Sequence, residues 1–293
     1  MDLFEKKNIK PMLIAEEKQP FDDINYIYEL KLDGIRCVAY LDKNSVELRN
    51  KRNDKLLFRY PELSEINKQI NCEKAILDGE LFVMKNGRTD FYEMQRRSLM
   101  TDKFKIEMAS KKLPISFTAF DILYKDNQQL TDLPLIERKQ ILQQSVIENE
   151  RISISRYIGK EGIKLFELTA QNELEGIVAK KKDSKYYFDK RTKDWIKIKN
   201  YEEEDFVIMG YSEESIILGQ YINGNLEQKG KVALGITKEQ WNIIRSQKEI
   251  NSSSDEVLIE PVLVCSVKYM KNSKGLRQAI FKGIRQDKNA IEN

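Results

Sequence analysis

A run of four acidic residues within 201–205 divides the sequence into two parts with different patterns. Before it, strand-like apolar runs alternate with helical segments; the two clearest, 61–70 and 134–148, each begin with proline, which suits the first turn of a helix. After it, short apolar stretches are separated by turn residues. The chain has 293 residues, a length that fits two domains of roughly 100 to 200 residues. We therefore expect domains at residues 1–200 and 201–293.

The second part has the pattern of a small β-barrel. Asn223-Gly224 is a strong signal for a tight β-hairpin. Thr237 and Gln240 have the spacing of a capping box, which predicts one helix. The apolar stretches lie at residues 206–210, 216–219, 231–235 and 257–267. About five short strands with one helix are typical of small barrels, of which the OB type is the commonest nucleic-acid-binding version.

The chain contains no histidine. A Ser-His-Asp triad, an imidazole base, a His-ligated zinc or haem and a histidine pH switch are therefore excluded. Any catalysis must use lysine, arginine, carboxylates, hydroxyls or the three cysteines, Cys37, Cys72 and Cys265. These cysteines are too far apart for a zinc ribbon and too few for a disulfide framework, which favours a reducing compartment.

No part of the sequence predicts a membrane-spanning segment. The N-terminus lacks an apolar stretch behind a basic start, and no apolar run approaches the roughly 20 residues that a membrane helix needs. We expect a soluble, cytoplasmic protein. The net charge of +3 is close to neutral, so overall charge says little about a nucleic-acid partner.

The distribution of charge is more informative than its total. Residues 180–199 hold nine Lys and Arg against three Asp, interleaved with four aromatic residues. Residues 268–288 hold seven Lys and Arg against one Asp. Basic residues mixed with aromatics suit a phosphate backbone with unstacked bases or a nucleotide ring. The alternative for either stretch is ordinary solvated surface charge.

Two strand-like runs meet at Asp33-Gly34, just after Lys31. A lysine on such a turn is held by the scaffold yet stays reachable from a cleft, as a nucleophile should be. At its usual pKa near 10.4, only about one lysine in a thousand is neutral near pH 7.4, so attack requires nearby cations or burial to lower the pKa. Arg36 and two later lysines are available for this. The alternative is an ordinary hairpin with a surface lysine.

Four further segments carry side chains that suit the binding of a nucleotide. Glu80 follows a short apolar strand and can hold a ribose hydroxyl or a hydrated Mg²⁺. Phe120 lies in an alternating strand and can stack on a base. Glu175 precedes Gly176, which repeats the acid–glycine pattern of Asp78-Gly79. Strict alternation places Lys197 and Lys199 on one face of a strand, where the pair forms an anion site. Each segment alone also fits a core strand with a solvated edge.

Together these segments resemble a known family. Residues 31–36, Lys-Leu-Asp-Gly-Ile-Arg, match KxDGxR, the signature of the covalent nucleotidyltransferases, which comprise DNA ligases, RNA ligases and mRNA capping enzymes. The later motifs of that family have counterparts in the same order: Asp78-Gly79-Glu80, Phe120-Asp121, Glu175-Gly176 and Lys197-Ile198-Lys199. The tail is similar to that of ATP-dependent DNA ligases and ends in their RxDK motif at 285–288. The similarity runs from Pro11 to Lys288.

The resemblance implies an α+β fold, with an ATP-grasp-like nucleotidyltransferase (adenylation) domain of antiparallel sheets and helices followed by an OB-fold β-barrel. It implies that Lys31 attacks the α-phosphate of ATP, forms lysyl-AMP and releases pyrophosphate. AMP would then pass to the 5′-phosphate of a DNA nick, and the 3′-hydroxyl would displace it. Transfer of this kind needs positioning and charge neutralisation more than proton shuttling, so histidine is dispensable.

The resemblance also assigns a role to individual residues. Glu29 faces the adenine amino group, Phe120 stacks on the ring, and Arg36 contacts the ribose or the 5′-phosphate of the nick. Lys197 and Lys199 contact the α-phosphate. Glu80 binds the ribose and, with Glu175, provides the ligands for Mg²⁺ or Mn²⁺. Arg285 and Lys288 meet the pyrophosphate once the barrel closes. The second family arginine is Arg52, with Arg49 as the rival.

The first hypothesis is therefore a minimal two-domain, ATP-dependent DNA ligase of the bacterial end-joining type. Its expected partner is nicked duplex DNA, with a Ku-like repair factor as a candidate. We expect a monomer, cytoplasmic and associated with the nucleoid, in a bacterium or phage system. The alternatives are an RNA ligase or capping-type nucleotidyltransferase, and a non-catalytic nucleic-acid-binding protein with a decayed site.

Overall fold

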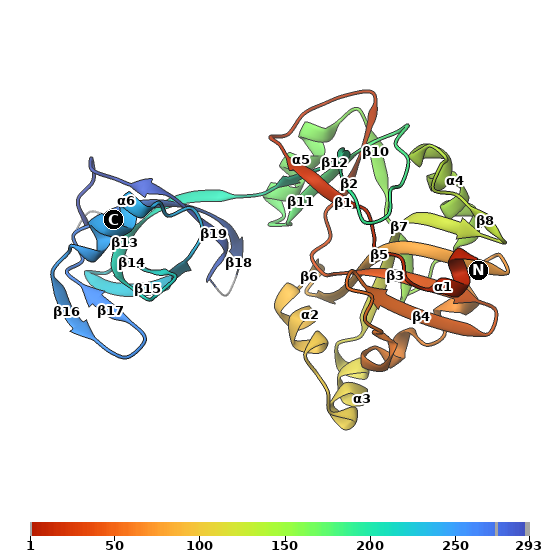
Figure 1. Ribbon diagram of the computed structural model, residues 1–293, viewed down its shortest axis with the longest axis horizontal. Helices are drawn as coiled ribbons and strands as arrows, with labels where there is room; N and C mark the ends of the chain where they lie inside the picture. Colours follow the sequence, from red (N-terminus) through yellow and green to blue (C-terminus); the bar gives the residue numbers. More distant parts are fainter. Residues whose placement is uncertain (1, 273–274, 291–293) are drawn as a thin grey trace. The chain divides into compact units, whose positions relative to one another are not determined.

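The computed structural model describes residues 2–272 and 275–290. The chain forms two compact units, residues 1–199 and 200–293, and the acidic run follows directly after this division. Figure 1 labels the helices and strands of each unit.

The first unit contains two sheets, in which nearly all pairings are antiparallel. One sheet has the order β1 (Leu13–Glu17), β12 (Arg191–Lys199), β11 (Gly176–Lys181), β2 (Tyr26–Leu30) and β10 (Tyr157–Gly159). The other has the order β4 (Ser45–Asn50), β3 (Ile35–Asp42), β5 (Lys74–Lys85), β7 (Ile115–Lys125) and β8 (Gln128–Gln129), with β6 (Arg88–Thr89) beside β5 and β9 (Ile152–Ile154) beside β7. β1 pairs with β12 and β9 pairs with β7 in parallel.

The central strands of the second sheet are buried on both faces. Cys37 and Ala39 of β3 belong to one apolar cluster, whereas Val38 and Tyr40 belong to another on the opposite face. Strands buried in this way read as continuous apolar runs rather than as alternating ones, which explains the run that follows Arg36 in the sequence.

The helices of the first unit are α1 (Leu3–Lys6), α2 (Phe91–Ser98), α3 (Lys103–Lys112), α4 (Leu135–Ser145) and α5 (Gly162–Gln171). The prediction of a helix within 134–148 is confirmed by α4. The prediction over 61–70 is wrong, because that segment forms only short 3₁₀ turns, η2 (Pro61–Leu63) and η3 (Ile66–Gln69), after η1 (Leu57–Arg59).

The spacing of buried residues explains the difference at 61–70. Tyr60, Leu63 and Ile66 are all buried, and their separation of three residues matches the 3.0 residues per turn of a 3₁₀ helix rather than the 3.6 of an α-helix.

The second unit is a curled antiparallel sheet (Figure 1). Its larger apolar cluster contains Phe206, Ile208 and Phe281. Its strands are β13 (Glu202–Tyr211), β14 (Ile216–Ile222), β15 (Asn225–Val232), β16 (Glu249–Ser252), β17 (Val257–Ile259), β18 (Val264–Asn272) and β19 (Gly275–Ile284). The order is β15-β14-β13-β17-β16, and β18 pairs with β13 and β19.

Local signals in the second unit are largely confirmed. Asn223 and Gly224 have φ values of 52° and 81° and join β14 to β15, as expected for a tight hairpin. The capping box at Thr237 begins α6 (Lys238–Arg245). The stretch 257–267 is not one strand, because Pro261 has no N–H for the ladder and falls between β17 and β18.

Gly176 is a position that only glycine fits. Its φ is +130°, and a Cβ atom there would lie 2.1 Å from the carbonyl oxygen of Ile198 on β12. We expect Gly176→Ala to lower the free energy of unfolding by more than about 2 kcal/mol, measured by urea denaturation. Gly87→Ala is the matched control, because Gly87 also has positive φ (+80°) but nothing within 4 Å of a Cβ. Equal losses in the two variants would contradict this account.

Candidate active site

Lys31 lies on the connection between β2 and β3 and is fixed there by its backbone. Its N–H donates to the carbonyl oxygen of Gly176 at 2.9 Å. Gly34 lets the same connection approach β5, since a Cβ atom there would lie 2.0 Å from the carbonyl oxygen of Leu81. The Lys31 side chain is 23% exposed, and its Nζ lies 2.7 Å from Glu175 Oε1. The amine is therefore held in place and still accessible.

Two further lysines extend from β12 toward the same region. Lys199 pairs in register with Gly176, and Lys197 lies two residues earlier on the same face. Their amines lie 4.0 and 3.6 Å from Glu17 Oε2 on β1. Burial, followed by the charges of Lys197 and Lys31, lowers the pKa of Lys199. The strand alternation predicted from sequence thus gathers three lysines.

Glu80 is the second carboxylate of this site. It lies on β5 opposite Arg36 in the register of β3 and β5. Burial raises the pKa of Glu80 to about 8, against the opposing charges of Lys31 and Arg36. In the part of the chain that the structure describes, no group of three or more His, Cys, Asp and Glu forms a metal cage.

Two carboxylates nevertheless fit a magnesium ion. Mg²⁺ is usually held by one or two carboxylates and completes its shell with water and substrate phosphates. Glu80 and Glu175 would hold it, and it would neutralise charge on the phosphates of a bound nucleotide.

Arg36 is oriented by a buried carboxylate. Its Nε and Nη2 lie 2.6 and 2.5 Å from the two carboxylate oxygens of Asp78, and the Tyr186 hydroxyl donates to the same group at 2.6 Å. The guanidinium lies 4.4 Å from the Phe120 ring centroid and 5.8 Å from that of Trp195. Asp78 thus holds Arg36 beside the aromatic residue expected to stack on adenine.

Glu29 lies in a buried ionic cluster. Its carboxylate forms ion pairs with Lys139 of α4 and, at 3.0 Å, with Lys180 of β11, and the Ser155 hydroxyl donates to it at 2.8 Å. Burial opposes the charged form, but the two lysines outweigh it and lower the pKa of Glu29. Burial lowers the pKa of Lys180 to about 8, and its amine lies 4.3 Å from the Phe120 ring centroid.

Sequence reasoning missed Lys139 and the pairing of Arg138 with Asp121. The Nε and Nη2 atoms of Arg138 each donate to one carboxylate oxygen of Asp121 at 2.8 Å. One signal was available. Leu135, Arg138, Lys139 and Leu142 follow the spacing of a buried helical stripe, and all four are buried. Cations within such a stripe indicate buried acidic partners, because an unpaired charge is costly in an apolar interior.

Of the four aromatic residues in the basic stretch 180–199, two are buried in the core, Phe188 is half-buried and Tyr187 is exposed. Tyr186 and Trp195 are buried and pack against each other with ring centroids 6.0 Å apart. They therefore offer no open face to a base. Phe120, which packs edge-on against Trp195 at 6.0 Å, remains half-buried at the edge of this cluster.

The remaining predicted residues are Arg49, Arg52, Arg285 and Lys288. Arg49 forms an ion pair with Glu47 on its own strand, whereas Arg52 is exposed on the turn that follows β4. Arg285 and Lys288 belong to the second unit, where both form ion pairs with Asp205. Residues 273–274 of the basic stretch 268–288 lie outside the described part of the chain.

The first unit is a two-sheet domain in which Lys31 lies near two further lysines and two carboxylates, and a small β-barrel follows it. This combination is typical of the covalent nucleotidyltransferases. Comparison with known proteins gives the family. The family model of the ATP dependent DNA ligase domain matches residues 11–199, and that of the ATP dependent DNA ligase C terminal region matches residues 212–288. The chain belongs to the ATP-dependent DNA ligases, and the RNA ligase and capping alternatives are not favoured.

Relatives and solved structures agree with this assignment. The SPbeta prophage-derived DNA ligase-like protein LigB of Bacillus subtilis is 32% identical over 91% of this chain and 94% of its own length. The DNA ligase of Thermococcus fumicolans is 28% identical over 98% of this chain, which spans 57% of that protein.

The fold matches a mycobacterial DNA ligase D complexed with ATP and MES, with a TM-score of 0.60, 24% identity and 97% of both chains covered. A Lig E DNA ligase structure gives a TM-score of 0.66 at 18% identity, covering 95% of this chain and all of its own. The predicted α+β architecture is thereby confirmed. Over the residues described, none of the helices has the length and apolar character needed to cross a membrane.

Removing the Glu29 charge would leave two buried lysines without their shared partner. We expect Glu29→Gln to lower the free energy of unfolding by about 3–5 kcal/mol near pH 7. The deficit should shrink as pH rises above about 8, because the buried Lys180, whose pKa is lowered to about 8, then loses its charge. Urea denaturation at pH 7 and pH 9 measures both effects.

Glu5→Gln is the matched control, since Glu5 pairs with Lys74 at 3.0 Å and its side chain is 52% exposed. That variant should lose no more than about 1 kcal/mol. A Glu29 variant as stable as this control would show that the buried cluster has no role in stability.

Proposed function

We propose that this chain seals nicks between a 5′-phosphate and a 3′-hydroxyl in duplex DNA through a lysyl-AMP intermediate on Lys31. The observation that carries the proposal is the position of Lys31. Its backbone N–H donates to the Gly176 carbonyl, and its amine lies 2.7 Å from Glu175 and shares its surroundings with Lys197 and Lys199.

In the first step, the neutral Lys31 amine attacks the α-phosphate of ATP. A P–N bond forms, the bond from the α-phosphorus to the pyrophosphate oxygen breaks, and pyrophosphate leaves. Lys197 and Lys199 stabilise the negative charge on the α-phosphate. Glu175 orients the amine, and Glu80 contacts the ribose.

The adenine site would be formed by Glu29 and Phe120. A carboxylate has about four acceptor positions, so the Glu29 group can accept from the adenine amino group as well as from its lysines. Arg36 beside Phe120 would contact the ribose or the 5′-phosphate of the nick. Arg52 is preferred over Arg49 as the second phosphate-binding arginine, because it is exposed while Arg49 is engaged with Glu47.

In the later steps, the 5′-phosphate of the nick attacks the AMP phosphorus and takes AMP from Lys31. The 3′-hydroxyl then attacks the activated 5′-phosphate and expels AMP. We propose Mg²⁺ or Mn²⁺ as the metal, a monomer as the active form, and the bacterial cytoplasm, at the nucleoid, as the location. Two relatives are named as non-homologous end joining proteins, which supports a Ku-like partner.

Labelling by the α-phosphate of ATP tests the first step. With α-labelled ATP and Mg²⁺, we expect the protein to retain label through denaturation. Lys31→Ala and Lys31→Arg should both abolish labelling, because neither side chain offers a neutral amine. Lys18→Ala, a change at an exposed lysine, should label normally. Labelling by GTP alone, or sealing of broken RNA but not of nicked DNA, would overturn the proposal.

The tail can be tested by separating the steps. We expect Arg285→Ala with Lys288→Ala to slow lysyl-AMP formation by at least about tenfold, because two charges that would meet pyrophosphate are lost. Sealing of a pre-adenylated nick should change by less than about twofold. Lys282→Ala, at an exposed lysine of β19, is the control. Equal loss in both steps would refute the role given to the tail.

A further inference from the structure

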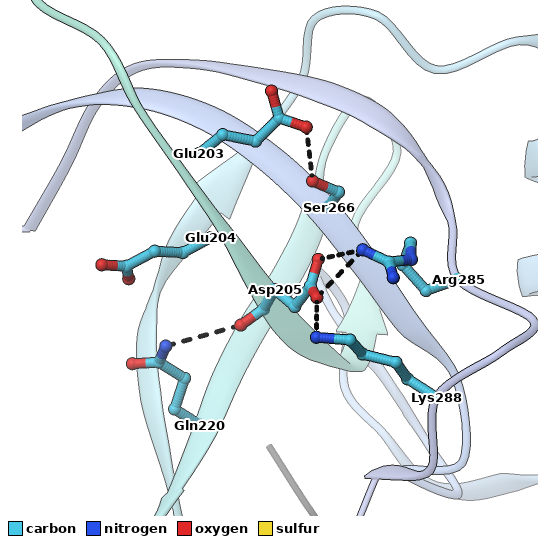
Figure 2. A pocket seen from close by; sticks show the side chains of 7 residues that line it. All are labelled: Glu203, Glu204, Asp205, Gln220, Ser266, Arg285 and Lys288. Carbon is cyan, nitrogen blue, oxygen red and sulfur yellow. Dashed lines mark hydrogen bonds and ion pairs between the residues drawn. The ribbon is translucent and has the colours of Figure 1, made fainter.

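One carboxylate binds both cations of the tail. Asp205 on β13 has its Oδ2 atom 3.2 Å from Arg285 Nη1 and 2.5 Å from Lys288 Nζ. Arg285 also forms a two-fold contact with Asp287, at 2.9 and 2.7 Å. Figure 2 shows the two cations converging on the Asp205 carboxylate from the segment that follows β19.

The backbone fixes the position of Asp205 relative to the tail. Asp205 pairs in register with Ser266 of β18. The Arg285 N–H donates to the carbonyl oxygen of Val264, the first residue of β18, at 2.7 Å. Both ends of the ion pair are therefore anchored to the same strand, and the Asp205 side chain is only 12% exposed. The pairing of the sheet therefore brings Asp205 and Arg285 together, and their ion pair does not depend on two mobile surface side chains.

The surroundings of the ion pair do not favour an anion. The pocket has a volume of about 580 Å³, and it is lined by Glu203, Glu204, Asp205, Gln220, Ser266, Arg285 and Lys288. Three carboxylates and two cations thus line the pocket, so its net charge is slightly negative. A phosphate group approaching the two cations in this arrangement would be repelled by the carboxylates.

We propose that Asp205 is a positioning residue that holds Arg285 and Lys288 on the second unit, so that these cations reach the phosphates of ATP only by exchanging Asp205 for a phosphate oxygen. The inference rests on the proposed role of the tail in lysyl-AMP formation. The Asp205 carboxylate offers the two cations the same kind of acceptor as a phosphate does. It therefore competes with ATP for them before the reaction and with pyrophosphate after it.

Asp205→Asn keeps the shape of the side chain and removes its charge. Because the competitor is weakened, we expect the KM for ATP in lysyl-AMP formation to fall about three- to tenfold, the range for loss of two partly exposed ion pairs. Inhibition of this step by pyrophosphate should become stronger by a similar factor. The rate of sealing a pre-adenylated nick should stay within about twofold.

Glu204→Gln is the matched control. Glu204 precedes Asp205 on the same strand and lines the same pocket, and in Figure 2 it faces away from the two cations. The Glu204→Gln variant loses the same charge as Asp205→Asn, but its KM for ATP should change by less than about twofold. An equal fall in both variants would show a general charge effect and would overturn the assignment to Asp205.

The triple variant decides whether Asp205 acts through the two cations. In a protein that already carries Arg285→Ala and Lys288→Ala, Asp205→Asn should have no further effect on the KM for ATP. A persisting effect, or a KM that is unchanged or raised by Asp205→Asn alone, would overturn the inference.

Hydrogen exchange gives a readout that does not depend on activity. The backbone amides of residues 285–288 should exchange faster in Asp205→Asn than in the wild type and the Glu204 control, because the tail loses its anchor. Unchanged exchange would overturn the inference even if the enzyme is active. If the wild type forms no lysyl-AMP, the proposed function fails, while faster exchange in this variant would still show that Asp205 holds the tail.

Discussion

The hydrogen bond between the Lys31 N–H and the Gly176 carbonyl connects the proposed nucleophile to the rest of its site. Gly176 begins β11, and β11 pairs with β12, which carries Lys197 and Lys199. The residue before Gly176 is Glu175, the ion-pair partner of Lys31. One backbone contact thus places an amine, a carboxylate and two further cations within a common region. On its other side, Gly176 lies so close to the Ile198 carbonyl of β12 that the position excludes a Cβ atom.

Around this region, buried charges orient the side chains expected to bind the nucleotide. Asp78 holds Arg36, and Lys139 with Lys180 hold Glu29. Buried ion pairs contribute little to net stability compared with apolar packing, but removing one partner is strongly destabilising. Such pairs fix a side chain in one orientation, and orientation is what phosphoryl-type transfer requires of a protein. The second unit applies the same device at its surface, where Asp205 holds two cations.

Much of this arrangement was predictable from sequence, because it depends on local order. Strand alternation placed Lys197 and Lys199 on one face. Asn223-Gly224 marked the hairpin between β14 and β15, and the Thr237 capping box marked the start of α6. What sequence could not provide were contacts between distant segments, such as Lys139 with Glu29 or Tyr186 with Asp78, since side-chain pairing across sheets depends on register. The 61–70 segment was misjudged because a proline start is shared by α- and 3₁₀-helices, and only the burial of Tyr60, Leu63 and Ile66 distinguishes them.

The absence of histidine has a consequence for how this protein responds to pH. Glu80 and Lys180 are ordinarily far from titrating near neutrality, yet burial brings the pKa of each to about 8. Their sensitivity to mild alkali is therefore a property of the folded state, in which both groups are buried, and not of the amino-acid composition. Any motion that admits water to Glu80 would bring its pKa back toward the ordinary value and leave the carboxylate charged near neutrality, so hydration and protonation are coupled at this residue.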